Sequence, residues 1–329
     1  MSFPADFRAY FPPIPSTLRS AKGRHRPAEM IAKGEATPSE FLEDAIARIE
    51  TLNPRINAIV LSLFDQARTA AKGPLPDGPF KGVPYAIKDL TDLKGTRRTS
   101  GSRLFANHIS TGTTPSVARS IAAGFLVLGK TNTPEFGLNA STESVLLGAC
   151  HNPWDLNHSS GGSSGGAGAA VASGMLPIAY ASDGGGSIRI PASCCGVFGL
   201  KPSRGRTVGA GTRPEDVGVE HCVSRSVRDS ARLFAWNERQ DAAAPLPPIG
   251  FISGPSSIRR TIGFATRDLY GQEPTASVKA EIERTAHLCR ALGHRVEEAR
   301  LPVDGEEFIR NYVTLRAADR QSFRQPSRQ

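Results

Sequence analysis

The chain has 329 residues, of which 39% are hydrophobic and 22% charged, and this balance is typical of a globular protein with a packed core. Its formal net charge is +9, but no basic stripe interleaved with aromatic side chains is present, which argues against a nucleic-acid-binding protein. No apolar run reaches the roughly 18 residues of a membrane span, and the N-terminus lacks the apolar segment of a secretory signal, so we expect no membrane association.

The cysteines and histidines do not predict a metal or a disulfide framework. The five cysteines are an odd number, include the adjacent pair Cys194-Cys195 and have no C-x-x-C spacing. The seven histidines show neither metal-ligand spacing nor a Ser-His-Asp pattern. We therefore expect a reducing, cytoplasmic setting and neither a metal nor a cofactor.

The first predicted helix follows a Pro- and Arg-rich stretch. Residues 1–26 lack periodicity, and we interpret them as a loosely ordered extension. Thr37 and Glu40 form a capping box with proline between them, and apolar residues then recur at helical spacing. Asn53-Pro54 is expected to stop this helix, and residues 56–64 to form a strand.

A short buried strand is predicted at residues 83–87, with Lys88 at its end. A lysine in that position either reaches back to solvent or is buried for a purpose. Residues 124–131 match the phosphate-loop pattern G-x-x-x-x-G-K-[ST]. That loop must follow a strand and open a helix, whereas here the middle positions are strand-like and a turn follows, so we reject a nucleotide site.

Two glycine-rich segments follow. Residues 159–166 are glycine and serine only, which suits a flexible linker, but the small residues at 167–172 indicate a tightly packed helix and favour close backbone approach. Three glycines then precede Ser187 in a sharp turn. Such a turn can expose backbone N–H groups beside the hydroxyl, as acyl transfer requires, although a plain turn with an incidental serine is the alternative.

The remaining chain alternates helical and strand patterns. We expect a helix at 226–234, a Pro-rich connector at 242–255, a strand at 258–265, a helix from Val278 that Gly293 ends, and a strand at 294–301. The predicted division is an extension at 1–26, one domain at 27–315 and an irregular tail at 316–329.

Five motifs together resemble the amidase signature family over roughly residues 28–314. They are Gly-Val-Pro-Tyr-Ala-Ile-Lys-Asp at 82–89, Gly-Lys-Thr-Asn-Thr-Pro-Glu-Phe-Gly at 129–137, Gly-Gly-Ser-Ser-Gly-Gly at 161–166, Asp-Gly-Gly-Gly-Ser-Ile-Arg-Ile-Pro at 183–191 and Cys-Gly-Val-Phe-Gly-Leu-Lys-Pro at 195–202. The Ala-Ser-Asp-Gly-Gly-Gly-Ser variant resembles the subgroup that contains 6-aminohexanoate cyclic dimer hydrolases. The resemblance implies an α/β fold with a mixed, twisted central sheet flanked by helices on both faces.

The resemblance also implies a catalytic triad. Ser187 matches the nucleophile, Ser163 the serine that follows a cis peptide bond, and Lys88 the base. The N–H groups around a glycine run match the oxyanion hole, which comprises Gly184, Gly185, Gly186 and the N–H of Ser187. A lysine in water has a pKa of about 10.4 and is protonated at pH 7, so this role requires burial to lower the pKa.

Asp183 and Arg189 flank the candidate nucleophile. We expect a supporting ion pair, with a clamp for a substrate carboxylate as the competing role of Arg189.

The predicted function is hydrolysis of a small-molecule linear or cyclic amide through an acyl-enzyme on Ser187. The family usually continues further than this chain, so we expect its C-terminal part to be absent and the pocket to be incomplete. A truncated, non-catalytic remnant or binding module is therefore one alternative. A subunit of the amidotransferase A type is another, although Gly184 stands where that group usually has threonine. We expect no nucleic-acid partner, and a homodimer stays open.

Overall fold

The computed structural model describes residues 27–209 and 216–322 of the chain. The expected extension at 1–26 lies outside these residues, as does the end of the tail, 323–329. The chain divides into two compact units, a larger one up to Ser253 and a smaller one from Gly254. The division falls inside the stretch 242–255 that we expected to be a connector. Among the described residues, no helix combines the length and the apolar character that crossing a bilayer requires.

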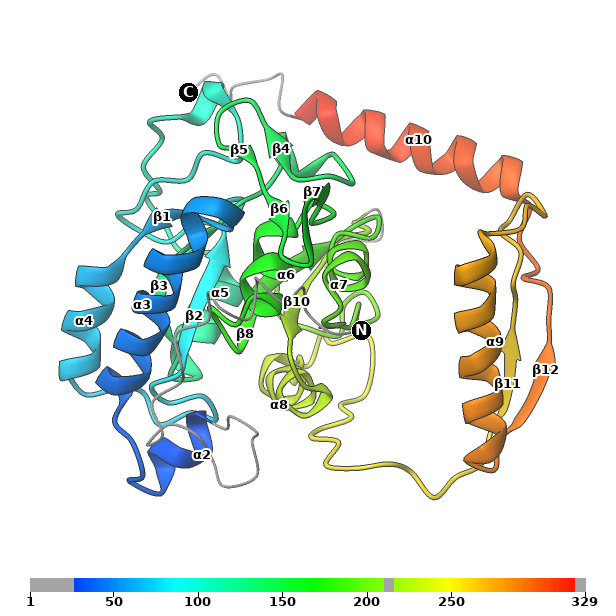
Figure 1. Cartoon of the computed structure of the whole chain (residues 1–329), viewed down its shortest axis with the longest axis horizontal. Helices are drawn as coiled ribbons and strands as arrows, with labels where there is room; N and C mark the ends of the chain where they lie inside the picture. Colours follow the sequence, from blue (N-terminus) through cyan, green and yellow to red (C-terminus); the bar gives the residue numbers. More distant parts are fainter. Residues whose placement is uncertain (1–26, 210–215, 323–329) are drawn as a thin grey trace. The chain divides into compact units, whose positions relative to one another are not determined.

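The larger unit is built on two three-stranded ladders. The first has the order β1-β3-β2, in which β1 (Ile59–Ser62) is antiparallel and β2 (Pro84–Lys88) parallel to β3 (Leu126–Thr131). The second has the order β8-β10-β9, with both pairings antiparallel; its strands are β8 (Ile178–Asp183), β9 (Phe198–Gly199) and β10 (Val219–Ser224). Strands β2 and β8, each at one edge of its own ladder, lie side by side, so that the two ladders form one central layer (Figure 1).

Alternate residues of these strands enter two separate cores, as the two-residue repeat of a strand requires. Ala86 of β2 and Ala181 of β8 face one core with helices α3 (Pro38–Ile56), α4 (Phe64–Lys72), α6 (Gly165–Ala172) and α7 (Arg189–Cys195). Tyr85 of β2 and Tyr180 of β8 face the other core with helices α5 (Pro115–Ala122) and α8 (Val227–Asn237). Helices therefore cover both faces of the central layer, as the family resemblance implied.

Of the covering helices, α3, α6 and α8 lie close to where the sequence indicated, whereas α2, α4 and α7 were not predicted. Their bounds are α2 Pro27–Ala32, α3 Pro38–Ile56, α4 Phe64–Lys72, α5 Pro115–Ala122, α6 Gly165–Ala172, α7 Arg189–Cys195 and α8 Val227–Asn237. In α3 the Thr37 hydroxyl accepts the Glu40 N–H, and the Glu40 carboxylate accepts the Thr37 N–H at 2.7 Å. The predicted capping box is confirmed.

The predicted stop of α3 at Asn53-Pro54 is wrong, because the helix continues to Ile56. Asn57 then adopts a left-handed conformation, and its N–H donates to the Asn53 carbonyl at 2.7 Å. The Asn53 side chain meanwhile accepts the N–H groups of Ala58 and Ile59. A left-handed cap supported by a side chain thus ends the helix one turn after the proline.

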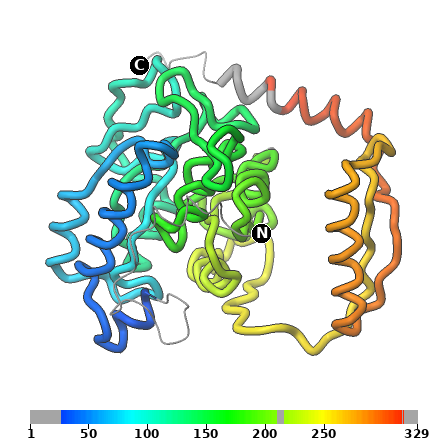
Figure 2. Tube along the Cα trace, viewed as in Figure 1, coloured from blue at the N-terminus to red at the C-terminus, as the bar shows by residue number. Residues whose placement is uncertain are grey.

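Helix α6 lies in the interior of the larger unit, and all eight of its residues are buried (Figures 1 and 2). Only its small side chains permit this. A Cβ on Gly166 would lie 2.6 Å from the Ala58 carbonyl oxygen and still closer to the Asn132 N–H, so backbone touches backbone there. The Gly/Ser segment before it is therefore not a linker, and it leads into a tightly packed helix as we expected.

Shorter elements complete this unit. They are the 3₁₀ turns Arg103–Phe105 and Glu135–Gly137 and the two-stranded pairs β4 (Glu143–Ser144) with β5 (Gly148–Ala149) and β6 (His151–Asn152) with β7 (Asp155–Ser159).

The smaller unit has a β-α-β core followed by one helix. Strands β11 (Thr261–Phe264) and β12 (Arg295–Glu298) are parallel, and α9 (Ala276–Ala291) connects them. Helix α10 (Gly305–Ser322) follows. The prediction of an irregular segment from 316 is wrong for residues 316–322, because they continue α10.

Candidate active site

Lys88 is the last residue of β2, and its side chain is fully buried. Its ammonium Nζ donates to the Ser163 hydroxyl at 2.7 Å and to the Ser182 hydroxyl at 3.3 Å. Burial lowers the pKa of Lys88 to about 7, while the negative charges of Asp183 and Glu220 act in the opposite direction. The lysine is thus not snorkelling to solvent, and its ammonium loses a proton far more readily than that of a solvated lysine.

Ser163 is 2% exposed and lies at the entrance to α6. The peptide bond between Gly162 and Ser163 is cis, as the resemblance implied. A Cβ on Gly162 would lie 2.6 Å from the Asn139 carbonyl oxygen and 2.7 Å from that of Ser141. Glycine at 162 therefore allows the segment to pass directly against the neighbouring loop and to hold the serine hydroxyl against Lys88.

Ser187 follows β8 on the glycine turn and is half-buried. Its carbonyl oxygen accepts the N–H of Ser164 at 3.2 Å, which ties the turn to the segment that carries Ser163. Gly186 has φ +122°, a conformation that favours glycine, and Ile188 behind the serine is fully buried. The three residues predicted as a triad therefore come from adjoining segments of the folded chain.

Asp183 organises the turn. One carboxylate oxygen accepts the Gly186 N–H at 2.6 Å, and the other accepts the Ile188 N–H at 3.2 Å. The Arg189 guanidinium donates to both oxygens, at 2.9 and 3.0 Å, so the expected ion pair is present. Burial alone would raise the pKa of Asp183, but these hydrogen bonds outweigh it and lower the pKa.

The Gly186 N–H does not fit the oxyanion role that we gave it, because Asp183 already accepts it. Among the residues that the structure describes, the N–H groups of Gly184, Gly185 and Ser187 have no recorded acceptor. These three donors remain available on the turn.

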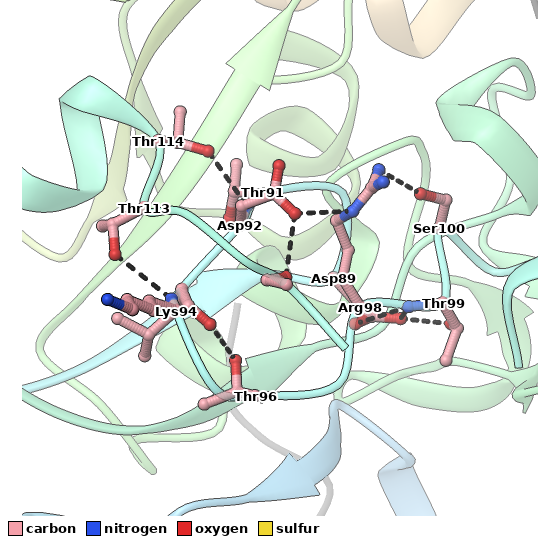
Figure 3. A network of polar contacts seen from close by, with 12 residues as sticks. Asp89, Thr91, Asp92, Lys94, Thr96, Arg98, Thr99, Ser100, Thr113 and Thr114 are labelled. Atoms are coloured by element: carbon pink, nitrogen blue, oxygen red, sulfur yellow. Dashed lines mark hydrogen bonds and ion pairs between the residues drawn. The ribbon is translucent and has the colours of Figure 1, made fainter. Parts of the chain in front are cut away.

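The loop that directly follows β2 is held by a polar network (Figure 3). The Asp89 carboxylate accepts both the N–H and the hydroxyl of Thr99. The Arg98 guanidinium forms an ion pair with Asp92 at 2.9 Å and donates a hydrogen bond to the Ser100 hydroxyl at 3.0 Å. Asp89 was not named from the sequence as part of the site. Its position directly after the predicted strand is the signal that could have indicated this role.

A second buried lysine, Lys130, lies on β3, the strand paired with β2. Its ammonium donates to the Thr91 carbonyl at 3.2 Å. Burial lowers its pKa to about 8, and the charge of Asp89 opposes this shift. Lys130 belongs to the segment 124–131 that matches the phosphate-loop pattern, and since β3 runs to Thr131, this lysine lies in a strand and not in a loop before a helix.

The candidate site does not coincide with a cavity of about 590 Å³ in the same unit. That cavity is lined by Pro84 and Pro177, at the opposite ends of β2 and β8 from Lys88 and Ser182. Nor does a metal site accompany the cluster: in the part of the chain that the structure describes, no three His, Cys, Asp or Glu side chains are arranged to hold an ion.

Comparisons with known proteins match the chain to one family. The Amidase family model matches residues 40–327. A 6-aminohexanoate-cyclic-dimer hydrolase from Pseudomonas sp. (strain NK87) is 39% identical over 316 residues, which cover 88% of this chain and 61% of the relative.

Solved structures match the chain as well. The structure of a 6-aminohexanoate cyclic dimer hydrolase with its substrate matches with a TM-score of 0.74 and 38% identity, over 83% of this chain and 59% of the other. That of a bacterial aryl acylamidase of the amidase signature family matches with a TM-score of 0.81 and 27% identity, over 94% and 68%. The chain thus spans about three fifths of the length of the relative and of the hydrolase structure, and on the family match it belongs to the amidase family.

Proposed function

We propose that the chain hydrolyses carboxylic amides through an acyl-enzyme on Ser187, with Ser163 and Lys88 as the other members of a triad. One observation carries the proposal: a fully buried lysine, with a pKa of about 7, donates at 2.7 Å to a serine next to the nucleophile turn. A general base works best with a pKa near the operating pH. A fully solvated lysine, protonated at pH 7, would not serve.

The reaction follows from this order of groups. Neutral Lys88 accepts the Ser163 proton while Ser163 accepts the proton of Ser187, whose oxygen attacks the amide carbonyl. The same relay returns a proton to the leaving amine or ammonia. Water then attacks the acyl-enzyme with the relay again acting as base, which releases the carboxylic acid and restores Ser187.

The oxyanion of each tetrahedral intermediate would be bound by the turn. Gly184, Gly185 and Ser187 supply the N–H groups, whereas Gly186 acts indirectly by fixing the turn through Asp183. A single oxyanion donor typically contributes about 3–4 kcal/mol to lowering the barrier. Arg189 holds Asp183, so its proposed role is support and not substrate capture.

The relatives suggest the substrate class. The matched proteins are named as hydrolases of a cyclic amide dimer and as acylamidases, and we propose a small linear or cyclic amide for this chain. Because the chain spans 61% of the first relative, activity of this chain alone is part of the proposal. The cytoplasmic setting and the homodimer stay predictions from the sequence.

The alternatives make different predictions. A non-catalytic remnant or binding module would keep the fold without a reactive serine. An amidotransferase A-type subunit would need partner proteins for activity, and Gly184 disfavours it.

A fluorophosphonate probe tests the proposal. We expect Ser187 to be labelled, labelling to vanish in Ser187→Ala, and its rate to fall by about 10²–10⁴ in Lys88→Met. Ser203→Ala, which removes an exposed serine, is the matched control and should label normally. A folded chain that takes up no label, or label that persists in Ser187→Ala, would refute the proposed function.

A further inference from the structure

The cavity of about 590 Å³ in the larger unit combines apolar surface with several arginines. One face of α3 lines it, because Phe41, Asp44 and Arg48 follow one another at the spacing of successive helical turns. Pro177, just before β8, adds apolar surface, and the junction between β10 and α8 adds Arg225. A cavity of this size and composition suits a small organic molecule with a charged group.

Arg48 is a buried cation on this lining, and it is only 6% exposed. Its Nε and Nη2 atoms donate to the Asp44 carboxylate at 3.0 and 3.2 Å. Among the described residues, its third nitrogen, Nη1, has no acceptor. Since buried polar groups are almost always hydrogen-bonded, the free Nη1 indicates room for a further acceptor.

Arg225 lies between the end of β10 and the start of α8. Its backbone N–H donates to the Pro177 carbonyl at 3.1 Å, and its side chain is exposed at the cavity. Within the part of the chain that the structure describes, its guanidinium has neither a hydrogen-bond acceptor nor an ion-pair partner. Burial lowers the pKa of Arg225, and the charge of Arg48 lowers it further, so two like charges lie near each other at this cavity.

The carboxylates on the lining are already bound. Asp44 accepts Arg48, as described above, and Asp229 accepts the Ser226 hydroxyl at 2.6 Å and pairs with Arg228 at 3.4 Å. Three guanidiniums therefore face two carboxylates on the described lining, which leaves one positive charge in excess. Ser226 also caps α8, and the N-terminus of a helix carries a partial positive charge that favours anions.

We propose that this cavity binds a small organic monocarboxylate, whose carboxylate group accepts hydrogen bonds from Arg48 and Arg225. The apolar body of the ligand would pack on Phe41 and Pro177. Guanidiniums bind carboxylates through short, charge-assisted hydrogen bonds. One excess positive charge fits a monoanion, whereas a phosphate dianion would be repelled by Asp44 and Asp229. The site uses no residue of the triad and does not depend on the proposed function.

Calorimetric titration with hexanoate tests the inference without requiring turnover. We expect saturable binding to the wild type, and hexanol, which has the same body without the charge, should bind about tenfold or more weakly. Arg225→Gln should weaken hexanoate binding by about 10–100-fold, because it removes a charge-assisted hydrogen bond, and Arg225→Lys, which keeps the charge, should weaken it less. The matched control is Arg310→Gln, which removes the same charge from an exposed position on α10 and should bind as the wild type does.

Lys88→Met separates this cavity from the candidate active site, since it removes the cation there. Hexanoate affinity that falls in Lys88→Met but not in Arg225→Gln would assign the ligand to the active site and overturn the inference. No binding at millimolar hexanoate, equal affinity for hexanol, or tighter binding of inorganic phosphate would overturn it as well. Binding that depends on Arg225 in a chain whose Ser187 takes up no fluorophosphonate would support this site while refuting the proposed function.

Discussion

Burial of Lys88 predicts a specific pH dependence of stability. The folded pKa is about 7, against the ordinary lysine value of 10.5 that applies to the unfolded chain. Between these values the unfolded chain binds a proton that the folded chain has released. The cost of burying the lysine is therefore full below pH 7, and it disappears as pH rises toward 10.5. In this window, the wild type gains stability as the solution becomes more alkaline.

Lys88→Met isolates this contribution, since methionine fills similar space without a charge. A difference of about 3.5 pKa units corresponds to about 5 kcal/mol, and it is an upper limit because the variant also loses hydrogen bonds to Ser163 and Ser182. Those bonds change little with pH. The stability advantage of the variant over wild type should therefore be greater at pH 6 than at pH 9, by about 2–3 kcal/mol.

Urea unfolding at pH 6, 7, 8 and 9 measures this difference. Both tryptophans, Trp154 and Trp236, lie in the larger unit with the lysine, so their fluorescence reports on its unfolding. Subtracting the free energies of the two proteins at each pH cancels the titration of all other groups. A difference that stays constant from pH 6 to pH 9 would show that Lys88 is protonated in the folded protein, and the reasoning would fail.

Three further predictions use the same unfolding measurements. Gly166→Ala should lower the free energy of unfolding by about 1–3 kcal/mol or more, because the new Cβ meets backbone atoms. Gly112→Ala, where a Cβ would have nothing within 4 Å, should leave it unchanged, and equal effects of the two variants would contradict the packing of α6. Asp183→Ala should lower the free energy of unfolding by about 2–4 kcal/mol, because it leaves buried N–H donors without an acceptor. Arg189→Ala, which removes a half-exposed side chain, should lower it by about 1 kcal/mol or less, and the reverse order would be inconsistent with the turn described. His221 has a pKa lowered to about 4 by burial, so the wild type loses up to about 3 kcal/mol as pH falls from 6.5 to 4, and His221→Leu should lose correspondingly less.

The candidate site was largely predictable because each of its members has a local signature. Lys88 ends an apolar strand, Ser163 follows glycines that permit close approach, and Ser187 follows a glycine turn. The phosphate-loop match was also resolved correctly from local pattern, since a strand cannot provide the N–H cradle that phosphate needs.

What the sequence did not predict depends on contacts of side chains with backbone N–H groups. The Gly186 N–H was assigned to the oxyanion hole, yet a carboxylate three residues earlier binds it. The end of α3 was misplaced because Asn53 and Asn57 support a cap after the proline. The proline in the sequence predicts an earlier stop and gives no sign of these contacts.

The burial of Lys88 also makes the reactivity of its amine depend on whether the chain is folded. While the protein is being synthesised, this lysine is an ordinary protonated side chain, like those on the surface, and no serine stands beside it. Its neutral amine forms near pH 7 only when β2, β8 and the buried helix α6 have assembled around it. Any chemistry that depends on the neutral amine is therefore silent in nascent or misfolded chains and begins when folding is complete.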